Sequence, residues 1–322
     1  MKRLIPTLLA VVILAAGFFY AKSQDFFREP PIEKLPLVEM QLNQVESIYL
    51  KLEDDELRMT RAGEEEWKLE DNPTYPLDSK RVEDWLVELL VATDNGMIDE
   101  SPGSLSEFGL EPPVLELGIK LSDNTEQSIQ VGNEMPVRGN HYLLKSDDPK
   151  LYRLENETKK ALFRDRLYFT DKNVLSLDLT KIHAVEYTLG DQSWRLERQG
   201  DENSSFNAPW KINGYDRKYT DISSILGQTM YMSTDELPLS VSDMNMEGAH
   251  LQIVVEEYVD GELTEHVVVG EVKDDEKVLV WEVGKYWGYM ITIDDLERLF
   301  LTGLEAIEEA AAEQENAEEK SD

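Results

Sequence analysis

The chain has 322 residues, of which 66 are acidic and 32 basic, and its formal net charge is −34. A field of this sign repels phosphate backbones and anionic lipid headgroups, so we expect no nucleic-acid partner. The chain contains no cysteine, which excludes disulfides, thiolate metal sites, a thiol nucleophile and a lipid-modified cysteine. Its 41% apolar and 9% aromatic residues are enough to build buried cores.

Residues 1–22 predict a single transmembrane anchor. Lys2 and Arg3 precede an apolar run from Leu4 to Ala21, which would span roughly 27 Å as a helix, close to the thickness of a hydrocarbon core. A cleaved signal peptide is the alternative, because Ala21-Lys22-Ser23 resembles a cleavage site. Both interpretations export the remainder, and the anchor predicts a single-pass protein of the cell membrane with an extracytoplasmic body.

Residues 23–44 predict an extended spacer between the anchor and the body. Pro30, Pro31 and Pro36 occur in this segment among residues of mixed polarity. Proline favours extended backbone, so we expect regular structure to begin only near Val45.

Residues 45–163 and 181–300 predict two copies of one α+β module, mainly of antiparallel sheet with helices, joined by a connection at 164–180. Matching positions of the two copies lie 137 residues apart at the start: Val45 with Ile182, Arg58 with Arg195, and Arg61 with Arg198. At Trp67 and Trp210 the offset becomes 143, because the second copy has a longer polar loop at 201–207. Insertions of this kind belong in surface turns.

Each copy continues with a helix, two alternating strands, a hairpin and a short closing helix. The first helix is predicted over 77–90, with Asp78 or Ser79 as its cap and with Val82, Leu86, Leu89 and Leu90 on its apolar face. Its counterpart lies at 219–232. We expect Trp67 and Trp210 to cover the two cores, and a stacking platform for a ligand is the alternative.

The segments 108–121, 129–144 and 162–189 resemble the bacterial domain of unknown function 4340. The most specific marks are Phe108-Gly109-Leu110 with Pro112, and Gly132 with Tyr142. The resemblance runs from Val45 to Phe300, although the second copy departs from it with "MEGAH" at 246–250. It implies a membrane-anchored extracytoplasmic protein, often associated with ABC-type transport or gliding-motility-like export. The resemblance implies no catalytic residues, because no activity is established for the family.

No catalytic, cofactor-binding or metal-binding residue is predicted. His141, His183, His250 and His266 lack the spacing of metal ligands, and phosphate-binding glycine loops and the nucleophile elbow are absent. The 66 acidic residues make some carboxylate pair near-certain by chance, so such a pair carries no weight. The candidate partner or ligand surface is the aromatic set of "WEVGKYWGY", which could stack on a peptide, a glycan or a protein, with core packing as the alternative: Trp281, Tyr286, Trp287 and Tyr289.

The acidic tail at 301–322 predicts disorder, because it has few large apolar residues to bury. The leading hypothesis for the whole chain is a non-enzymatic envelope protein that binds or organises a partner, such as an ABC-type permease or associated envelope proteins. One alternative is a hydrolase that acts on cell-wall polymer. Another is an extracytoplasmic module that binds or senses a ligand.

Overall fold

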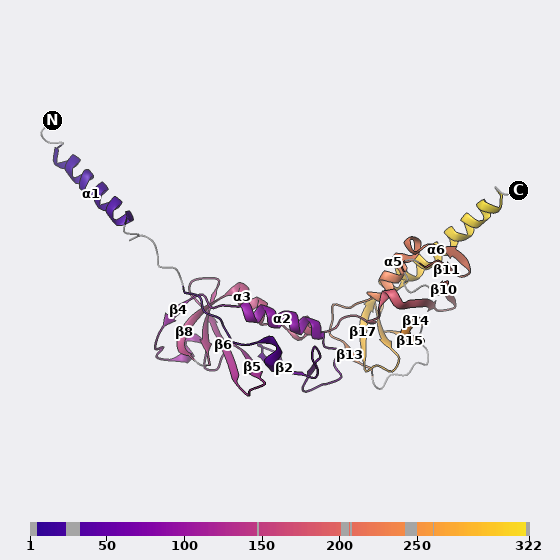
Figure 1. Cartoon of the computed structure of the whole chain (residues 1–322), viewed down its shortest axis with the longest axis horizontal. Coiled ribbons are helices and arrows are strands. Elements are labelled where there is room, and N and C mark those ends of the chain that lie inside the picture. The colour runs from indigo at the N-terminus through magenta and orange to yellow at the C-terminus, as the bar shows by residue number, and fades with distance from the viewer. Residues whose placement is uncertain are drawn as a thin grey trace.

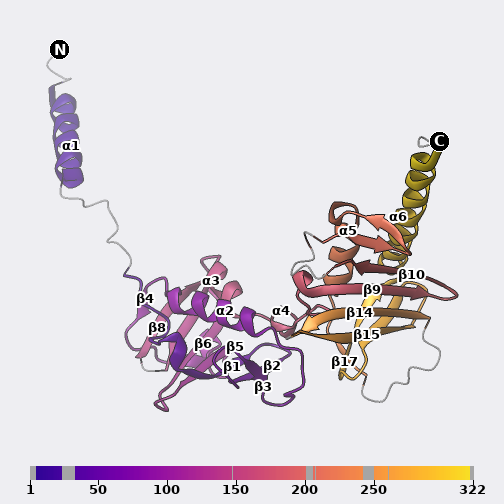
Figure 2. The same ribbon diagram turned by 45° about the vertical axis from the view of Figure 1, so that its right-hand side comes forward.

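The computed structural model describes residues 5–23, 33–146, 148–200, 206, 208–241, 250–259 and 261–319. Two antiparallel sheets follow one another along the chain, each with helices packed against it (Figures 1 and 2). The predicted α+β class is therefore confirmed. The longer loop at 201–207 and the "MEGAH" turn at 246–250 fall mostly outside the described residues.

The first sheet has eight strands in the order β3-β2-β1-β5-β6-β7-β8-β4. Side chains alternate between buried and partly exposed along its central strands, which is the pattern that predicts strands from the sequence. The strands are β1 (Val45–Lys51), β2 (Glu56–Arg61), β3 (Trp67–Leu69), β4 (Met97–Asp99), β5 (Leu115–Leu121), β6 (Glu126–Glu134), β7 (Asn140–Lys145) and β8 (Asp148–Glu155).

The second sheet has nine strands in the order β12-β11-β10-β9-β14-β15-β16-β17-β13. The strand order of the second sheet repeats that of the first, with β12 added at one edge. The corresponding strands are β9–β11 with β1–β3, β13 with β4, and β14–β17 with β5–β8. The strands are β9 (Ile182–Leu189), β10 (Gln192–Arg198), β11 (Trp210–Ile212), β12 (Tyr215–Arg217), β13 (Leu239–Ser240), β14 (Leu251–Val259), β15 (Glu262–Val272), β16 (Lys277–Glu282) and β17 (Trp287–Thr292).

We call each sheet with its helices a module; the predicted residue boundaries of the modules stay predictions. Helices α2 (Ser79–Val91) and α3 (Asn156–Leu162) belong to the first module, and α5 (Tyr219–Met230) and α6 (Ile293–Glu319) to the second. Between the modules lie the short α4 (Arg166–Phe169) and the 3-10 turn Leu179–Lys181, and two further 3-10 turns occur at Leu42–Gln44 and Leu105–Phe108.

Helix α2 shows why the helical prediction succeeded and where its detail failed. The Asp78 carboxylate accepts a hydrogen bond from the Arg81 backbone, as expected of the cap. Val82, Trp85, Leu86 and Leu89 are the buried side chains, whereas Leu90 is 36% exposed, so its placement in the core was wrong. A 3.6-residue period puts position 85, rather than 90, on the face of positions 82, 86 and 89.

Trp67 and Trp210 are both fully buried in the cores of their modules. The Trp67 ring lies under the Arg61 guanidinium, 4.5 Å from it, and its indole nitrogen donates a hydrogen bond to Glu83 at 2.7 Å. A buried ring with these contacts offers no stacking surface, so its role is core packing.

Helix α1 runs from Ile5 to Ser23. In the part of the chain that the structure describes, no helix combines the length and the apolar character needed to cross a membrane. The predicted anchor at residues 1–22 is therefore not confirmed.

Residues 33–44 are not a free spacer, and we call them the strap. Leu37 and Val38 are buried in the first core, and the Leu37 backbone donates a hydrogen bond to the Ala92 carbonyl. Lys145 binds the strap to the first module. Its ammonium group lies 2.6 Å from the buried Asp94 carboxylate and donates a hydrogen bond to the Pro36 carbonyl of the strap. Regular contacts thus begin well before Val45, while residues 24–32 lie outside the described residues.

The predicted disorder of the tail is corrected for residues 301–319, because α6 continues to Glu319, while residues 320–322 lie outside the described residues. Small residues let this helix lie close to the second sheet: a Cβ atom added at Gly303 would come within 2.3 Å of the Trp194 ring. The buried Arg217 guanidinium then donates to the Ala306 carbonyl and pairs with Glu313 at 2.7 Å. The few large apolar residues of the tail contribute as well, because Leu304 and Ile307 pack against the second core.

The marks of the family resemblance meet at one corner of the first module. Gly109 adopts a left-handed backbone with φ of 68°, and the Phe108 ring packs on Tyr142 with centroids 4.8 Å apart. Gly132 passes directly beneath this turn, where an added Cβ atom would lie 2.1 Å from the Phe108 carbonyl oxygen. The corner is therefore a packing device, and glycine is required because only hydrogen fits there.

We predict that Gly132→Ala destabilises the first module by roughly 1–3 kcal/mol, because backbone atoms must move to admit the methyl group. Urea unfolding followed by circular dichroism measures this change. Gly103→Ala is the matched control, since no atom lies within 4 Å of its added Cβ atom, and we expect a change below about 0.5 kcal/mol. Equal effects of the two substitutions would contradict the packing role.

We predict that Asp94→Ala lowers the free energy of unfolding by about 3 kcal/mol, because it leaves the Lys145 ammonium group without its buried partner. Asp84→Ala removes an exposed ion pair with Lys80 and should cost less than about 1 kcal/mol. Urea unfolding compares the two variants. If Asp94→Ala cost no more than Asp84→Ala, the strap would not depend on this pair.

Candidate functional site: the cleft between the modules

The connection between the modules is bonded by its backbone to both of them. On the first-module side, Asp78 N donates to Phe169 O and Asp171 N donates to Pro76 O, both at 2.8 Å. On the second-module side, Val174 N donates to Met232 O at 2.9 Å and Thr234 N donates to Lys172 O at 3.0 Å. We call the segment 169–174, with these four bonds, the joint.

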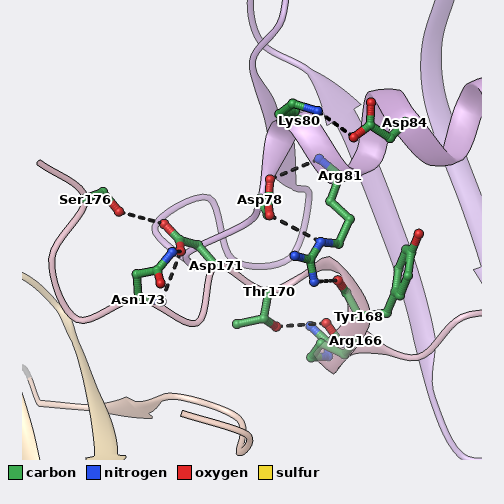
Figure 3. Close-up of polar contacts among 10 residues, drawn as sticks. All are labelled: Asp78, Lys80, Arg81, Asp84, Arg166, Tyr168, Thr170, Asp171, Asn173 and Ser176. Atoms are coloured by element: carbon green, nitrogen blue, oxygen red, sulfur yellow. Dashed lines mark hydrogen bonds and ion pairs between the residues drawn. The ribbon is translucent and has the colours of Figure 1, made fainter. Parts of the chain in front are cut away.

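Side chains at the N-terminal end of α2 hold the joint on the first module (Figure 3). Arg81 reaches from the helix to the Tyr168 carbonyl at 3.3 Å, while its Nε atom lies 3.3 Å from the Asp78 carboxylate. The hydroxyl of Thr170 donates to the Arg166 carbonyl at 2.8 Å. The cap of α2 and the connection are thus parts of one polar network.

An aromatic contact joins the modules beside this network. The rings of Tyr75 and Trp287 meet edge to face, with centroids 5.2 Å apart, and Trp287 packs on the core of the first module. The Tyr75 hydroxyl lies 2.6 Å from the Thr170 hydroxyl, in the joint itself. A hairpin of the second module is therefore seated on the first, where burial and ring geometry both favour contact.

A cavity of about 290 Å³ opens at this contact, and we call it the inter-module cleft. Its walls come from the loop before α2, from the joint and the residues after it, and from β15 and the β16–β17 hairpin. The lining residues are Thr74, Pro76, Asp171, Asn173, Val174, Ser176, Leu177, His266, Glu282, Lys285, Tyr286, Trp287 and Tyr289.

Three of the four aromatic residues proposed from the sequence line this cleft: Tyr286, Trp287 and Tyr289. Trp281 does not, because it is buried on the opposite face of β16 in a small cluster with Val269 and Leu279. Adjacent side chains of a strand point to opposite faces, so Glu282 lies in the cleft while Trp281 lies away from it.

An ionisable group of the second module forms one wall. The His266 Nδ1 atom lies 2.8 Å from the Glu282 carboxylate, and its Nε2 atom lies 3.6 Å from that of Glu257. Glu257 is buried and also accepts a hydrogen bond from the Asp178 backbone at 3.1 Å. The histidine is thus held between two carboxylates, and its orientation is fixed by the pair at 2.8 Å.

The opposite wall is formed by the joint. The Asp171 carboxylate accepts hydrogen bonds from the Asn173 backbone and side-chain amide and from the Ser176 hydroxyl, at 2.9–3.1 Å (Figure 3). Both of its oxygen atoms are used in shaping this turn. Asp171 therefore contributes negative charge to the cleft from a fixed position.

Burial raises the pKa of Tyr289 in the cleft and of Tyr75 beside it. Burial raises the pKa of Tyr289, and the nearby Asp171, Tyr75 and Glu282 raise it further. Burial likewise raises the pKa of Tyr75, against the lowering effect of its hydrogen bond with Thr170. Both hydroxyl groups consequently stay protonated at neutral pH and can donate hydrogen bonds.

The remaining histidines lie elsewhere. His141 is buried in the first sheet, where burial and the charge of Lys159 lower its pKa, and His183 packs against the Tyr258 ring. In the part of the chain that the structure describes, no group of three or more His, Asp or Glu side chains is arranged to hold a metal ion. The sequence did not single out the ionisable residues of the cleft, because they come from distant segments and share no spacing.

A larger depression of about 620 Å³ lies on the first module beside α3 and α4. Lys159, Lys160 and Arg164 line it together with Asp54 and Asp55 among others. It contains none of the four aromatic residues proposed from the sequence, and no described residue of the second module lines it. The inter-module cleft is the better candidate because both modules and the joint contribute to it.

We predict that Trp287→Ala loosens the joint. The lost ring contact is worth about 1 kcal/mol, which should raise the rate of trypsin cleavage after Lys172 about fivefold, because the joint must open for cleavage. Tyr286→Ala, which removes a 58% exposed ring of the same hairpin, serves as the control and should leave the cleavage rate unchanged. Equal rates for Trp287→Ala and the unmodified chain would contradict the role of the ring.

Comparison with known proteins identifies a family. The family model described as "Domain of unknown function (DUF4340)" matches residues 67–234, from β3 of the first module through the joint to the residues after α5. No curated protein and no solved structure matches the chain significantly. The match is shorter than the resemblance from Val45 to Phe300, but it covers just over half of the chain. This chain therefore belongs to the DUF4340 family.

Proposed function

We propose that this chain is a non-enzymatic binding protein of the cell envelope, held at the membrane by residues 1–22 and acting as an accessory component of an ABC-type transport or export system. Its body lies on the extracytoplasmic side, and its partner is a permease or an associated envelope protein. The observation that carries the proposal is the continuous bonding of the strap, the first module, the joint and the second module, which suits a scaffold.

The anchor is inferred from the sequence. The run from Leu4 to Ala21 contains no charged residue, and basic residues precede and follow it. A single apolar helix without interior charge cannot form a polar conduction path, so its role is to tether. Tethering raises the effective concentration of the body toward a partner in the same bilayer.

The strap limits the reach of the body. Because the first module bonds the chain from Lys34 and Leu35 onward, only residues 24–33 separate these bonds from α1. Ten residues span at most roughly 36 Å even when fully extended. The first module is thereby kept near the bilayer surface, within reach of the external parts of a permease.

The cleft chemistry supports binding over hydrolysis. A glycosidase needs a carboxylic acid whose pKa is raised so that it can protonate the leaving group. In the cleft, both oxygen atoms of the Asp171 carboxylate accept hydrogen bonds from Asn173 and Ser176, and Glu282 is paired with His266, so both carboxyl groups already have partners within the protein. The wall-polymer hydrolase is therefore the alternative with less support.

A ligand-binding or sensing role is the second candidate. It is favoured by the inter-module cleft, whose aromatic and ionisable residues converge from both modules. Clefts between domains are a common location of ligand sites. This role is compatible with the scaffold, since a ligand held there would contact both modules at once.

The test compares three versions of the chain in cells that lack the native gene: the full chain, the body 23–322 exported without an anchor, and the same body fused to an unrelated single-pass helix. We expect the first and third to restore the phenotype and the second to restore it poorly, because only the second loses its membrane position. Cross-linking followed by mass spectrometry should recover an ABC-type permease or its subunits with the full chain.

Full restoration by the exported body without an anchor would overturn the tether. Turnover of purified cell-wall polymer by the same body would support the hydrolase instead. Circular dichroism of the exported body checks that it is folded, so that a failure to restore cannot be attributed to unfolding.

A further inference from the structure

We propose that the inter-module cleft binds one ring of a neutral, polyhydroxylated ligand, a saccharide unit. The inference rests on the binding role proposed above, but not on the anchor or on the permease partner. It deepens the second candidate function by naming the class of ligand.

The first step is size. The cleft holds about 290 Å³, just below the volume of typical sites for drug-sized ligands. It therefore admits a single ring or one side chain rather than a folded peptide segment. Longer ligands would have to extend out of it past the exposed Tyr286.

The second step is charge. The two carboxylates of Asp171 and Glu282 outnumber the one lysine, Lys285, so an anion is disfavoured; both carboxylates already have partners in the protein, so neither requires a cation. His266 Nδ1 is hydrogen-bonded to Glu282 of the protein itself, while its Nε2 atom is buried without a hydrogen-bond partner among the described residues, 3.6 Å from Glu257. A neutral ligand leaves these charges in place and needs no compensating partner for its own.

The third step is the pairing of rings with hydrogen-bonding groups. Tyr286 and Trp287 offer aromatic faces, and the apolar C–H face of a sugar ring stacks on such faces. Tyr289 lines the cleft, and its hydroxyl, protonated at neutral pH like any phenol, can donate to a ligand oxygen. Glu282 uses Oε1 for His266, and its other oxygen can accept from a ligand hydroxyl.

The lining thus supplies donors, acceptors and stacking faces around carboxylates that are already paired within the protein. Hydroxyl groups, which both donate and accept, match such a lining better than a purely cationic or purely anionic group. Because Thr74 and Pro76 come from the first module and the rings from the second, the bound ring would contact both.

The experiment uses three sugars of similar size that differ in charge: neutral N-acetylglucosamine, cationic glucosamine and anionic glucuronic acid. The full chain is kept in a detergent without a sugar headgroup, and saturation-transfer NMR measures the binding of each sugar at millimolar concentration. We expect saturable binding of N-acetylglucosamine that exceeds the binding of both charged sugars.

Two variants with matched controls locate the site. Tyr286→Ala should weaken binding roughly 3- to 10-fold, whereas Tyr231→Ala, which removes a 69% exposed ring outside the cleft, should leave it unchanged. Glu282→Gln should also weaken binding, whereas Glu271→Gln on the adjacent strand should not. Circular dichroism confirms that each variant is folded.

Preferential binding of glucosamine or glucuronic acid, no saturable binding of any of the three sugars, or equal effects of Tyr286→Ala and Tyr231→Ala would each overturn the inference. None of these outcomes depends on the membrane. If the sugars fail to bind while the anchored chain still cross-links to a permease, the ligand class is wrong and the scaffold proposal stands. Sugar binding without cross-linking would support the cleft and contradict the permease partner.

Discussion

The backbone bonds of residues 169–174 constrain the relation between the two modules. This short segment is bonded on one side to Pro76 and Asp78 and on the other to Met232 and Thr234. Thr170 and Val174 are buried, so rotation of the modules would leave polar backbone groups in the interior without partners. An unmade bond of this kind costs about 1–3 kcal/mol, more than a formed one contributes. The joint therefore stays closed because breaking its hydrogen bonds costs more than forming them contributes, even without a large interface between the modules.

The cleft depends on this joint. Its rings belong to a hairpin whose tip turns at Gly284, where φ is 87°, a conformation that glycine adopts without strain. The turn directs Trp287 toward Tyr75, and the closed joint brings Asp171 opposite Glu282 along the same cavity. Neither module has the cleft alone. The repeated fold therefore acquires a site through the way its copies are joined, rather than through a motif within either copy.

Local patterns were enough to predict the strands, the repeat and a cap at Asp78 or Ser79, of which the structure has Asp78, because alternation and capping depend on neighbours in the sequence. The strap was missed because its prolines suggested a spacer, whereas the burial of Leu37 and Val38 depends on a distant core. Side chains alternate between the two faces of β16, which places Trp281 on the face away from the cleft. This assignment requires the bounds of the strand, which the sequence alone did not provide. The opposed Asp171 and Glu282 are 111 positions apart in the chain, and no sequence pattern relates such residues.

The ends of helix α2 have a mechanical consequence. The strap bonds to Ala92, just past its C-terminal end, and the joint bonds to Asp78, just before its N-terminal end. Tension applied to the N-terminus of the chain and resisted at the second module would therefore run along the helix axis, over roughly 20 Å. The load would fall on the Lys145–Asp94 pair at one end and on the network of Arg81 and Tyr168 at the other. The strands of the first sheet lie beside α2 rather than along this path, so stretching would detach the strap or the joint before it pulled out one of those strands.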